Sequence, residues 1–146
     1  MNMNIAIING PNLNLVGRRE PEIYGNRSLD DYLKQLTTRY RDVAFMLFQS
    51  NHEGAIIDEL QRLGFDCDGI VLNAGGYTHT SIAIRDAVAA ITAPVVEVHI
   101  SDIYSREPFR RTSMIKDVCA HSIVGQGLDG YRQAIEFLLN LPTHST

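Results

Sequence analysis

The chain has few cysteines and no long hydrophobic run, and each shortage excludes a class of protein. Among its 146 residues, Cys67 and Cys119 are the two cysteines, and their spacing fits neither a disulfide framework nor a zinc motif. No apolar run approaches the roughly 20 residues of a membrane helix, and the amino-terminal sequence lacks the pattern of a secretory signal. We therefore expect a cytoplasmic protein with reduced thiols and no membrane partner.

Positive charge is also scarce. The 13 Lys and Arg residues face 17 Asp and Glu residues, which gives a formal net charge of -4 and a pI near 5.7. Nucleic-acid binding through a basic surface is not expected from this balance. A small molecule or a protein is the expected partner.

The pattern of apolar residues predicts one compact domain, 1–146, which is long enough to bury a core. Expected strands lie at 5–9, 43–49, 69–73, 95–100 and 122–124, and expected helices at 28–41, 51–63, 80–91 and 128–141. Strands that are nearly all apolar and alternate with helices predict an α/β fold with a parallel sheet covered on both faces. The flavodoxin-like strand order 2-1-3-4-5 is favoured, in a three-layer sandwich.

Local signals refine this outline. Ser28 is a candidate amino-terminal cap, and Gly64 occupies a position that favours a left-handed carboxyl-terminal cap. Residues 10–27 follow neither helix nor strand periodicity, so we expect a long polar loop there. Loops of this length inside a compact domain tend to be lids or binding loops.

Polar residues follow three strands that would be adjacent in this sheet. They lie at residues 9–12, 73–79 and 97–101. Ligands bind beyond the carboxyl ends of the strands in open parallel sheets, near the point where strand order reverses. We therefore expect the functional site at this edge.

Three residues near this edge each allow a structural and a functional interpretation. Glu97 and His99 share one face of a strand that should be apolar, so they form either a structural hydrogen bond or an acid–base pair in which the carboxylate sets the tautomer of the ring. His79 either caps a helix or contacts a ligand. A metal site made of the three is conceivable, but their spacing matches no familiar ligand motif, and we do not expect a metal.

The basic residues leave further alternatives open. Arg18 and Arg19 in the long loop are either a solvated stretch or a means of lowering the pKa of Tyr24, which would then act as a base. Spacing alone does not decide which arginine of the later cluster reaches the site, and that cluster consists of Arg106, Arg110 and Arg111.

Several common mechanisms lack their residues. Neither Lys34 nor Lys116 lies at a strand end, which disfavours a Schiff base. No phosphate-binding glycine loop follows the first strand, and Asn73 stands where a response regulator would need Asp. A hydrolase using His99 would lack a nucleophile elbow.

Four segments together resemble the type II 3-dehydroquinate dehydratases. They are Asn9-Gly10-Pro11-Asn12-Leu13-Asn14-Leu15, the loop from Gly17 to Gly25, the turn from Asn73 to Ser81, and Glu97-Val98-His99-Ile100-Ser101. The resemblance covers nearly the whole chain. It implies loss of water from 3-dehydroquinate through an enolate to give 3-dehydroshikimate, in the shikimate pathway or in quinate catabolism.

The resemblance also implies roles for individual residues. Tyr24 would be the base, Arg19 would stabilise charge from a lid at about 17–25, Asn12 would hold a water, and His99 would protonate the departing hydroxyl. The substrate would be bound by Asn73, His79, Arg110, Ile100 and Ser101, with Asp86 reaching a neighbouring subunit's site.

The family pattern implies neither cofactor nor metal, and a homododecamer built as a tetramer of trimers. A binding module that keeps the pocket without the chemistry is the non-enzymatic alternative. The presence of Tyr24, Arg19 and His99 argues against it.

Overall fold

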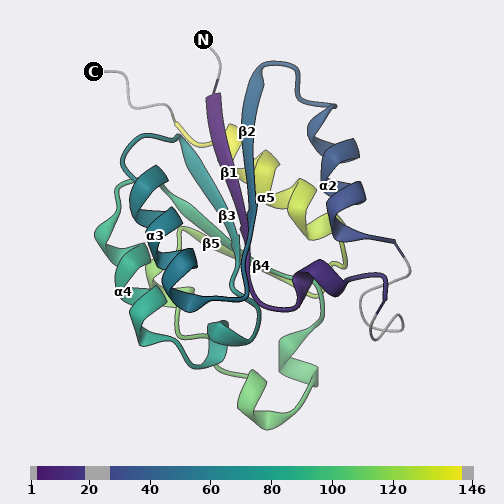
Figure 1. The fold of residues 1–146 in the computed structure, drawn as a ribbon, viewed down its shortest axis with the longest axis vertical. Coiled ribbons are helices and arrows are strands. Elements are labelled where there is room, and N and C mark those ends of the chain that lie inside the picture. Colours follow the sequence, from purple (N-terminus) through teal and green to yellow (C-terminus); the bar gives the residue numbers. More distant parts are fainter. Residues whose placement is uncertain (1–2, 19–26, 143–146) are drawn as a thin grey trace.

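The structure is a computed structural model that describes residues 3–18 and 27–142. Strands and helices alternate along these residues (Figure 1). The strands are β1 (Met3–Asn9), β2 (Val43–Gln49), β3 (Gly69–Asn73), β4 (Val95–His99) and β5 (His121–Val124). The α-helices of the described residues are α2 (Leu29–Thr37), α3 (Glu53–Leu63), α4 (Ile82–Ala90) and α5 (Asp129–Leu139).

The strands form one parallel sheet in the order β2-β1-β3-β4-β5, so the predicted flavodoxin-like α/β fold is confirmed. β1, β3 and β4 are the three central strands. Asn9, the last residue of β1, pairs in register with Asn73, the last residue of β3. The carboxyl ends of the central strands therefore meet at one edge, as predicted.

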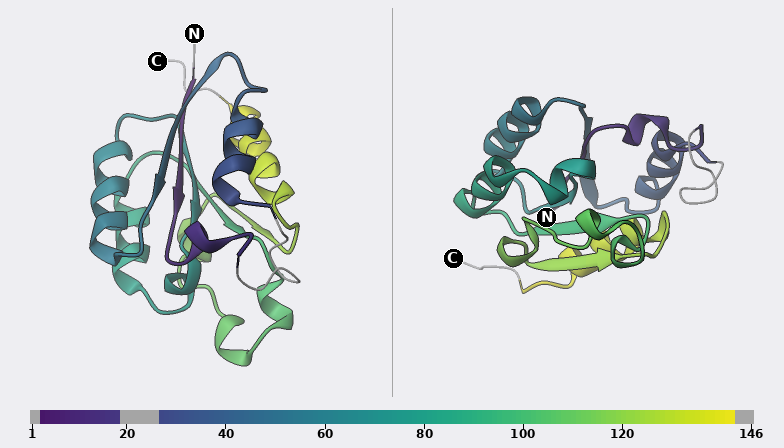
Figure 2. Two further views of the ribbon diagram at one scale, coloured as in Figure 1. Left: turned by 45° about the vertical axis from the view of Figure 1, so that its right-hand side comes forward. Right: turned by 90° about the horizontal axis from the view of Figure 1, so that it is seen from below.

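Helices cover both faces of this sheet (Figure 2), with α3 and α4 on one face and α2 and α5 on the other. Alternate residues of β1 serve the two cores. Ile5 and Ile7 pack with α2 and α5, whereas Ala6 and Ile8 pack with α3 and α4. A strand buried on both faces must be apolar throughout, and burying each large side chain stabilises the fold by about 1.5–3 kcal/mol.

Two helix boundaries depend on serine caps. The Ser28 hydroxyl accepts a hydrogen bond from the Asp31 N–H at 3.3 Å, which confirms the predicted start of α2. The Ser81 hydroxyl accepts one from the Ile84 N–H at 2.9 Å, so α4 begins after Ser81 rather than at Thr80. His79 ends the short 3-10 helix η2 (Gly75–His79) and does not cap α4.

The left-handed cap predicted at Gly64 is wrong. Gly64 has φ -67° and ψ -15°, which is right-handed helical backbone. Its small size is needed for space, because a Cβ atom there would lie 2.4 Å from Ile91 Cγ2 and 2.5 Å from the Leu60 carbonyl oxygen. The Gly64 carbonyl also accepts a hydrogen bond from the Ala93 N–H at 2.8 Å. The carboxyl-terminal end of α3 therefore packs closely against Ile91 and Ala93, which follow α4.

Residues 101–118 form a lobe that leaves the sheet between β4 and β5. Its 3-10 helices η3 (Ile103–Ser105) and η4 (Pro108–Arg110) are drawn in green at the bottom of Figure 1, past the carboxyl ends of the central strands. The third, η5 (Lys116–Val118), lies against α4. Among the helices of the described residues, none has both the length and the apolar character that crossing a membrane requires.

Candidate active site

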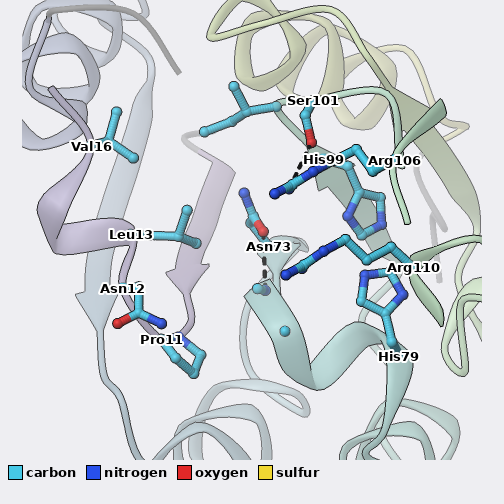
Figure 3. A pocket seen from close by; sticks show the side chains of 13 residues that line it. Pro11, Asn12, Leu13, Val16, Asn73, His79, His99, Ser101, Arg106 and Arg110 are labelled. Carbon is cyan, nitrogen blue, oxygen red and sulfur yellow. Dashed lines mark hydrogen bonds between the residues drawn. The ribbon is translucent and has the colours of Figure 1, made fainter. Parts of the chain in front are cut away.

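A cavity of about 140 Å³ opens where the central strands end (Figure 3). Its walls come from the loop after β1, from η2 after β3, and from the end of β4 with the lobe that follows. Seven residues predicted for the site line this cavity: Asn12, Asn73, His79, His99, Ile100, Ser101 and Arg110. The fold thus gathers side chains from three distant segments of the sequence.

Glu97 and His99 are both buried and directly bonded, on the sheet face covered by α3 and α4. His99 Nε2 lies 2.8 Å from Glu97 Oε2, and that oxygen also accepts a hydrogen bond from Ser113 Oγ at 2.9 Å. Ser122 Oγ donates to the other carboxylate oxygen at 2.7 Å. Burial opposes ionisation of Glu97, but the hydrogen bonds and the charge of His99 outweigh it, so the pKa of this carboxyl lies below its usual value.

The direction of this bond fixes the orientation of the histidine. An ionised carboxylate only accepts hydrogen bonds, so His99 Nε2 carries a hydrogen and donates this bond to Glu97. Nδ1 is then the ring nitrogen left for a ligand. His99 also lines the cavity, so its ring can contact a ligand there while Glu97 holds it from behind.

His79 is oriented in a similar way by a backbone carbonyl. Its Nδ1 lies 2.8 Å from the Thr112 oxygen, which can only accept, so Nδ1 is the donor. Burial lowers the pKa of His79, which favours a neutral ring whose Nε2 is an acceptor. The His79 and His99 rings are stacked with centroids 6.4 Å apart. Two oriented imidazoles therefore lie next to each other in the cavity wall.

The three residues considered as metal ligands are engaged with other partners. His99 and Glu97 bond to each other, and His79 bonds to a carbonyl. Over residues 3–18 and 27–142, no group of three or more His, Cys, Asp or Glu side chains is arranged to hold a metal ion.

Asn12 is held in an unusual backbone conformation. It has φ 70°, and of the non-glycine residues that the structure describes it is the one with positive φ. Asparagine tolerates this left-handed region better than most residues. The Asn12 N–H donates to Asn51 Oδ1 at 3.0 Å, and Gln49 Nε2 donates to the same oxygen at 3.2 Å. The loop after β1 is thus tied to the end of β2.

The loops after β1 and β3 are also in close contact. Gly10 N–H donates to the Asn73 carbonyl at 2.7 Å, and a Cβ atom on Gly10 would lie 2.6 Å from the Ala74 oxygen. Only glycine permits this approach of two backbones. It brings Asn12 and Asn73 to the lining of one cavity (Figure 3).

Two arginines of the lobe reach the cavity. Arg106 Nη1 lies 3.3 Å from Ser101 Oγ and donates to it, while Arg110 Nε donates to Glu107 Oε1 at 3.1 Å. Both arginines line the cavity, whereas Arg111 is exposed outside it. Two guanidinium groups on one wall make the cavity suitable for an anionic ligand.

Two predicted site residues, Arg19 and Tyr24, lie outside the described residues, and of the predicted lid at about 17–25 the structure describes Gly17 and Arg18. Glu97 lies behind His99 and does not itself line the cavity. Asp86 is exposed on α4 and does not line the cavity of its own chain.

Comparison with known proteins identifies the family. A sequence model described as Dehydroquinase class II matches residues 3–139. The chain is 54% identical over 138 residues to the 3-dehydroquinate dehydratase of Exiguobacterium sp., with 94% of each chain covered. It is 52% identical over 139 residues to that of Roseiflexus castenholzii, covering 94% of this chain and 88% of the relative. The crystal structure of type II dehydroquinase from Butyrivibrio crossotus matches with a TM-score of 0.90 and 47% identity, covering 95% of this chain and 99% of the other.

This chain belongs to the class II dehydroquinase family. The resemblance noticed in four sequence segments is therefore confirmed, together with the fold that it implied. The cavity of this dehydroquinase is thus lined by two oriented histidines and two arginines.

Sequence reasoning missed several residues that support this dehydroquinase site. Ser113 and Ser122 bind Glu97 from the lobe and from β5, and no spacing signal connects them to it. Spacing did not decide which of three arginines reaches the cavity, and Arg106 is one that does. Tyr131 reads in the sequence as one apolar residue of α5, although its hydroxyl bonds to Asn73. The one sequence signal for this hydroxyl is Asn9, a polar residue at the end of a buried strand, which needs a buried hydrogen-bond partner.

Proposed function

We propose that this dehydroquinase removes water from 3-dehydroquinate in the cavity at the sheet edge, with Tyr24 as the base and His99 as the acid. The chain is a 3-dehydroquinate dehydratase, a hydro-lyase of the shikimate pathway. The observation that supports this location is that seven predicted residues line one cavity.

The reaction needs one proton removed and one delivered. Tyr24, as a phenolate, takes the proton from the carbon next to the ketone, and the electron pair moves to the ketone oxygen to form an enolate. A water held by Asn12 donates a hydrogen bond to that oxygen. When the enolate collapses, the carbon–oxygen bond breaks in an anti elimination, and the protonated His99 gives its proton to the departing hydroxyl, which leaves as water.

Two neighbours make these proton transfers feasible. The Arg19 guanidinium, which is always charged, lowers the pKa of Tyr24 and stabilises the negative charge that develops. The Glu97 carboxylate holds the His99 ring in one orientation through the 2.8 Å hydrogen bond, with Nδ1 left to act on the substrate. We assign Arg19 and Tyr24 to a lid at about 17–25 of a single domain, which excludes water when it closes.

Substrate binding uses the rest of the cavity. The amides of Ile100 and Ser101, with the Ser101 hydroxyl, hold the carboxylate, and Arg106 beside Ser101 adds positive charge. The substrate hydroxyls are bound by Asn73, His79 and Arg110, which line the same cavity. Neither a cofactor nor a metal takes part in this scheme.

The test of this mechanism is turnover by purified, chelator-treated protein, followed by the ultraviolet absorbance of the conjugated enone product. We expect Tyr24→Phe and Arg19→Ala each to lower kcat at least 100-fold, within the roughly 10²–10⁴ range for acid–base groups. Tyr104→Phe and Arg111→Ala are matched controls, because both residues are exposed and neither lines the cavity.

The outcomes of that test separate the alternatives. Near wild-type turnover in Tyr24→Phe would move the base elsewhere and leave the overall reaction intact. Binding of 3-dehydroquinate without turnover by the wild-type protein would favour the binding module.

We further propose a cytoplasmic homododecamer, a tetramer of trimers, in which Asp86 of one subunit completes the site of its neighbour. Sedimentation should give twelve times the chain mass of 16.3 kDa, about 196 kDa. Mixing inactive Asp86→Ala and inactive His99→Ala subunits should restore activity, because some hybrid sites pair an intact cavity with an intact Asp86. No gain over the separate variants would contradict a role between subunits.

A further inference from the structure

Three buried polar side chains form a line of hydrogen bonds behind the cavity. The Tyr131 hydroxyl donates to Asn9 Oδ1 at 2.6 Å and accepts from Asn73 Nδ2 at 3.0 Å. Tyr131 is fully buried, and Asn9 and Asn73 are 4% and 3% exposed. Asn73 lines the cavity, whereas Tyr131 and Asn9 do not. The Tyr131 hydroxyl on α5 is thus linked to the cavity through the Asn73 side-chain amide.

The direction of every bond in this line is fixed by a backbone group. Gly75 N–H can only donate, and it lies 3.1 Å from the Asn73 side chain, so the atom that it meets is the carbonyl oxygen Oδ1 (Figure 3). Nδ2 of Asn73 therefore faces Tyr131. The hydroxyl oxygen accepts from that nitrogen, and its own proton must go to Asn9.

We infer that Tyr131 is a positioning residue, which holds the Asn73 amide so that it presents an N–H group to an acceptor oxygen of the substrate. This inference rests on the proposed function, in which Asn73 contacts substrate. An amide nitrogen has two N–H bonds, and Tyr131 takes one of them. The other remains for a hydroxyl or carboxylate oxygen in the cavity.

The chemistry of α5 supports a specific role for this hydroxyl. Tyr131 lies in the core formed by α2, α5 and one face of the sheet, where its buried neighbours Ala134, Ile135 and Leu138 are apolar. A phenylalanine would serve that packing equally well, and a buried hydroxyl is costly unless it is bonded. Burial raises the pKa of the Tyr131 phenol, so it keeps its proton and remains a donor to Asn9.

Without the Tyr131 hydroxyl, the Asn73 amide loses the partner of its nitrogen end. Gly75 N–H alone binds the oxygen from one side, and the amide is free to rotate away from the orientation that suits the substrate. The ring and the rest of the core stay the same in Tyr131→Phe. Substrate affinity should therefore fall more than the folded structure is disturbed.

The experiment compares Tyr131→Phe with Tyr40→Phe by steady-state kinetics with 3-dehydroquinate. Tyr40 is a matched control because its hydroxyl also makes a hydrogen bond involving α5, to Glu136 Oε2 at 2.7 Å, and does so away from the cavity. We expect Tyr131→Phe to lower kcat/KM about tenfold, mainly through KM, because uniform binding is lost. Tyr40→Phe should leave both constants within about twofold.

A double-mutant cycle shows whether Tyr131 acts through Asn73. We expect Asn73→Ala to raise KM, and Tyr131→Phe to cause no further change in that background, because coupled residues are not additive. Independent, additive losses would overturn the inference, as would a Tyr131→Phe enzyme with the kinetics of Tyr40→Phe. Unchanged kinetics of Asn73→Ala would overturn the binding role of Asn73 and this inference together, while a wild-type protein without turnover would point to failure of the proposed function itself.

A second variant keeps the test available if Tyr131→Phe does not fold. Asn9→Ala removes the acceptor of the Tyr131 proton, and Asn9 does not line the cavity, so the side-chain route from Asn9 to the substrate is through Tyr131 and Asn73. We expect KM to rise about threefold. A folded Asn9→Ala enzyme with an unchanged KM would overturn the inference.

Discussion

The Glu97 carboxylate sets the chemistry of His99. It accepts a hydrogen bond from the ring and from two serines, and it is 1% exposed. This bond fixes which ring nitrogen faces Glu97 and leaves Nδ1 as the nitrogen that can exchange a proton with a ligand. Alternation along β4 was enough to predict that the two residues share a face. The serines could not be predicted, because Ser113 and Ser122 reach Glu97 only after the lobe and β5 have folded back onto β4.

Glu97→Gln tests this arrangement. The amide keeps the shape but not the charge, so we expect kcat to fall roughly 10- to 100-fold, part of the 10²–10⁴ typical of an acid–base group. The amide can also donate a hydrogen bond where the carboxylate only accepts, so the orientation of the His99 ring is no longer fixed. Steady-state rates at one pH give the result.

Glu136→Gln is the matched control for that experiment, because Glu136 is a partly buried carboxylate whose partner is Tyr40 rather than a residue of the cavity. Its kcat should stay near that of the wild type. A Glu97→Gln enzyme with full kcat would contradict the role of the carboxylate.

Helix α3 contains one glycine near its start and is followed by another at its end. A Cβ on Gly54 would meet nothing within 4 Å, whereas a Cβ on Gly64 would lie within 2.6 Å of Ile91 and of the Leu60 carbonyl. We expect Gly54→Ala to raise the free energy of unfolding by about 0.5–1 kcal/mol, since alanine favours helix. Gly64→Ala should lower it by about 1–3 kcal/mol through overpacking. Urea denaturation measures both, and a stabilised Gly64→Ala would contradict the close approach.

The elements themselves were largely predictable, and their ends were less so. Periodic apolar residues located each strand and helix, and the Ser28 cap was predicted correctly. The helix expected to reach Arg41 ends at Thr37, and the one expected from Thr80 begins at Ile82. Gly64 shows why such errors arise, because a glycine required for space has the same sequence signal as one required for positive φ.

The free energy of unfolding of the whole molecule should fall as the pH falls below neutral. The pKa of Glu97 is lowered by its hydrogen bonds despite burial, and the pKa of Asp129 is lowered to about 2, chiefly by its hydrogen bond with Arg132. Such carboxyls bind fewer protons when folded than when unfolded. Their contribution is therefore complete above their ordinary pKa and is lost as the pH falls through the folded value.

His79 adds to this trend with the same sign. Burial lowers its pKa, so the folded state favours the neutral ring, and stability is lost as the pH falls below the ordinary value of 6.5. We expect the urea midpoint to fall steadily from pH 7 to pH 4, and less steeply between pH 7 and pH 5 in His79→Gln. A midpoint that rises toward pH 4 would contradict these pKa shifts.

The order of strands and helices, the family, and most of the residues that line the cavity follow from the amino-acid sequence. They do so because apolar periodicity is local and because the polar residues follow strands whose carboxyl ends must meet in a parallel sheet. Tertiary structure alone decided the orientation of each polar group, since that depends on partners far away in the chain: Thr112 for His79, Ser113 and Ser122 for Glu97, and Tyr131 for Asn73. A hydrogen bond requires its two atoms to lie about 3 Å apart, and only the folded chain fixes distances of that size.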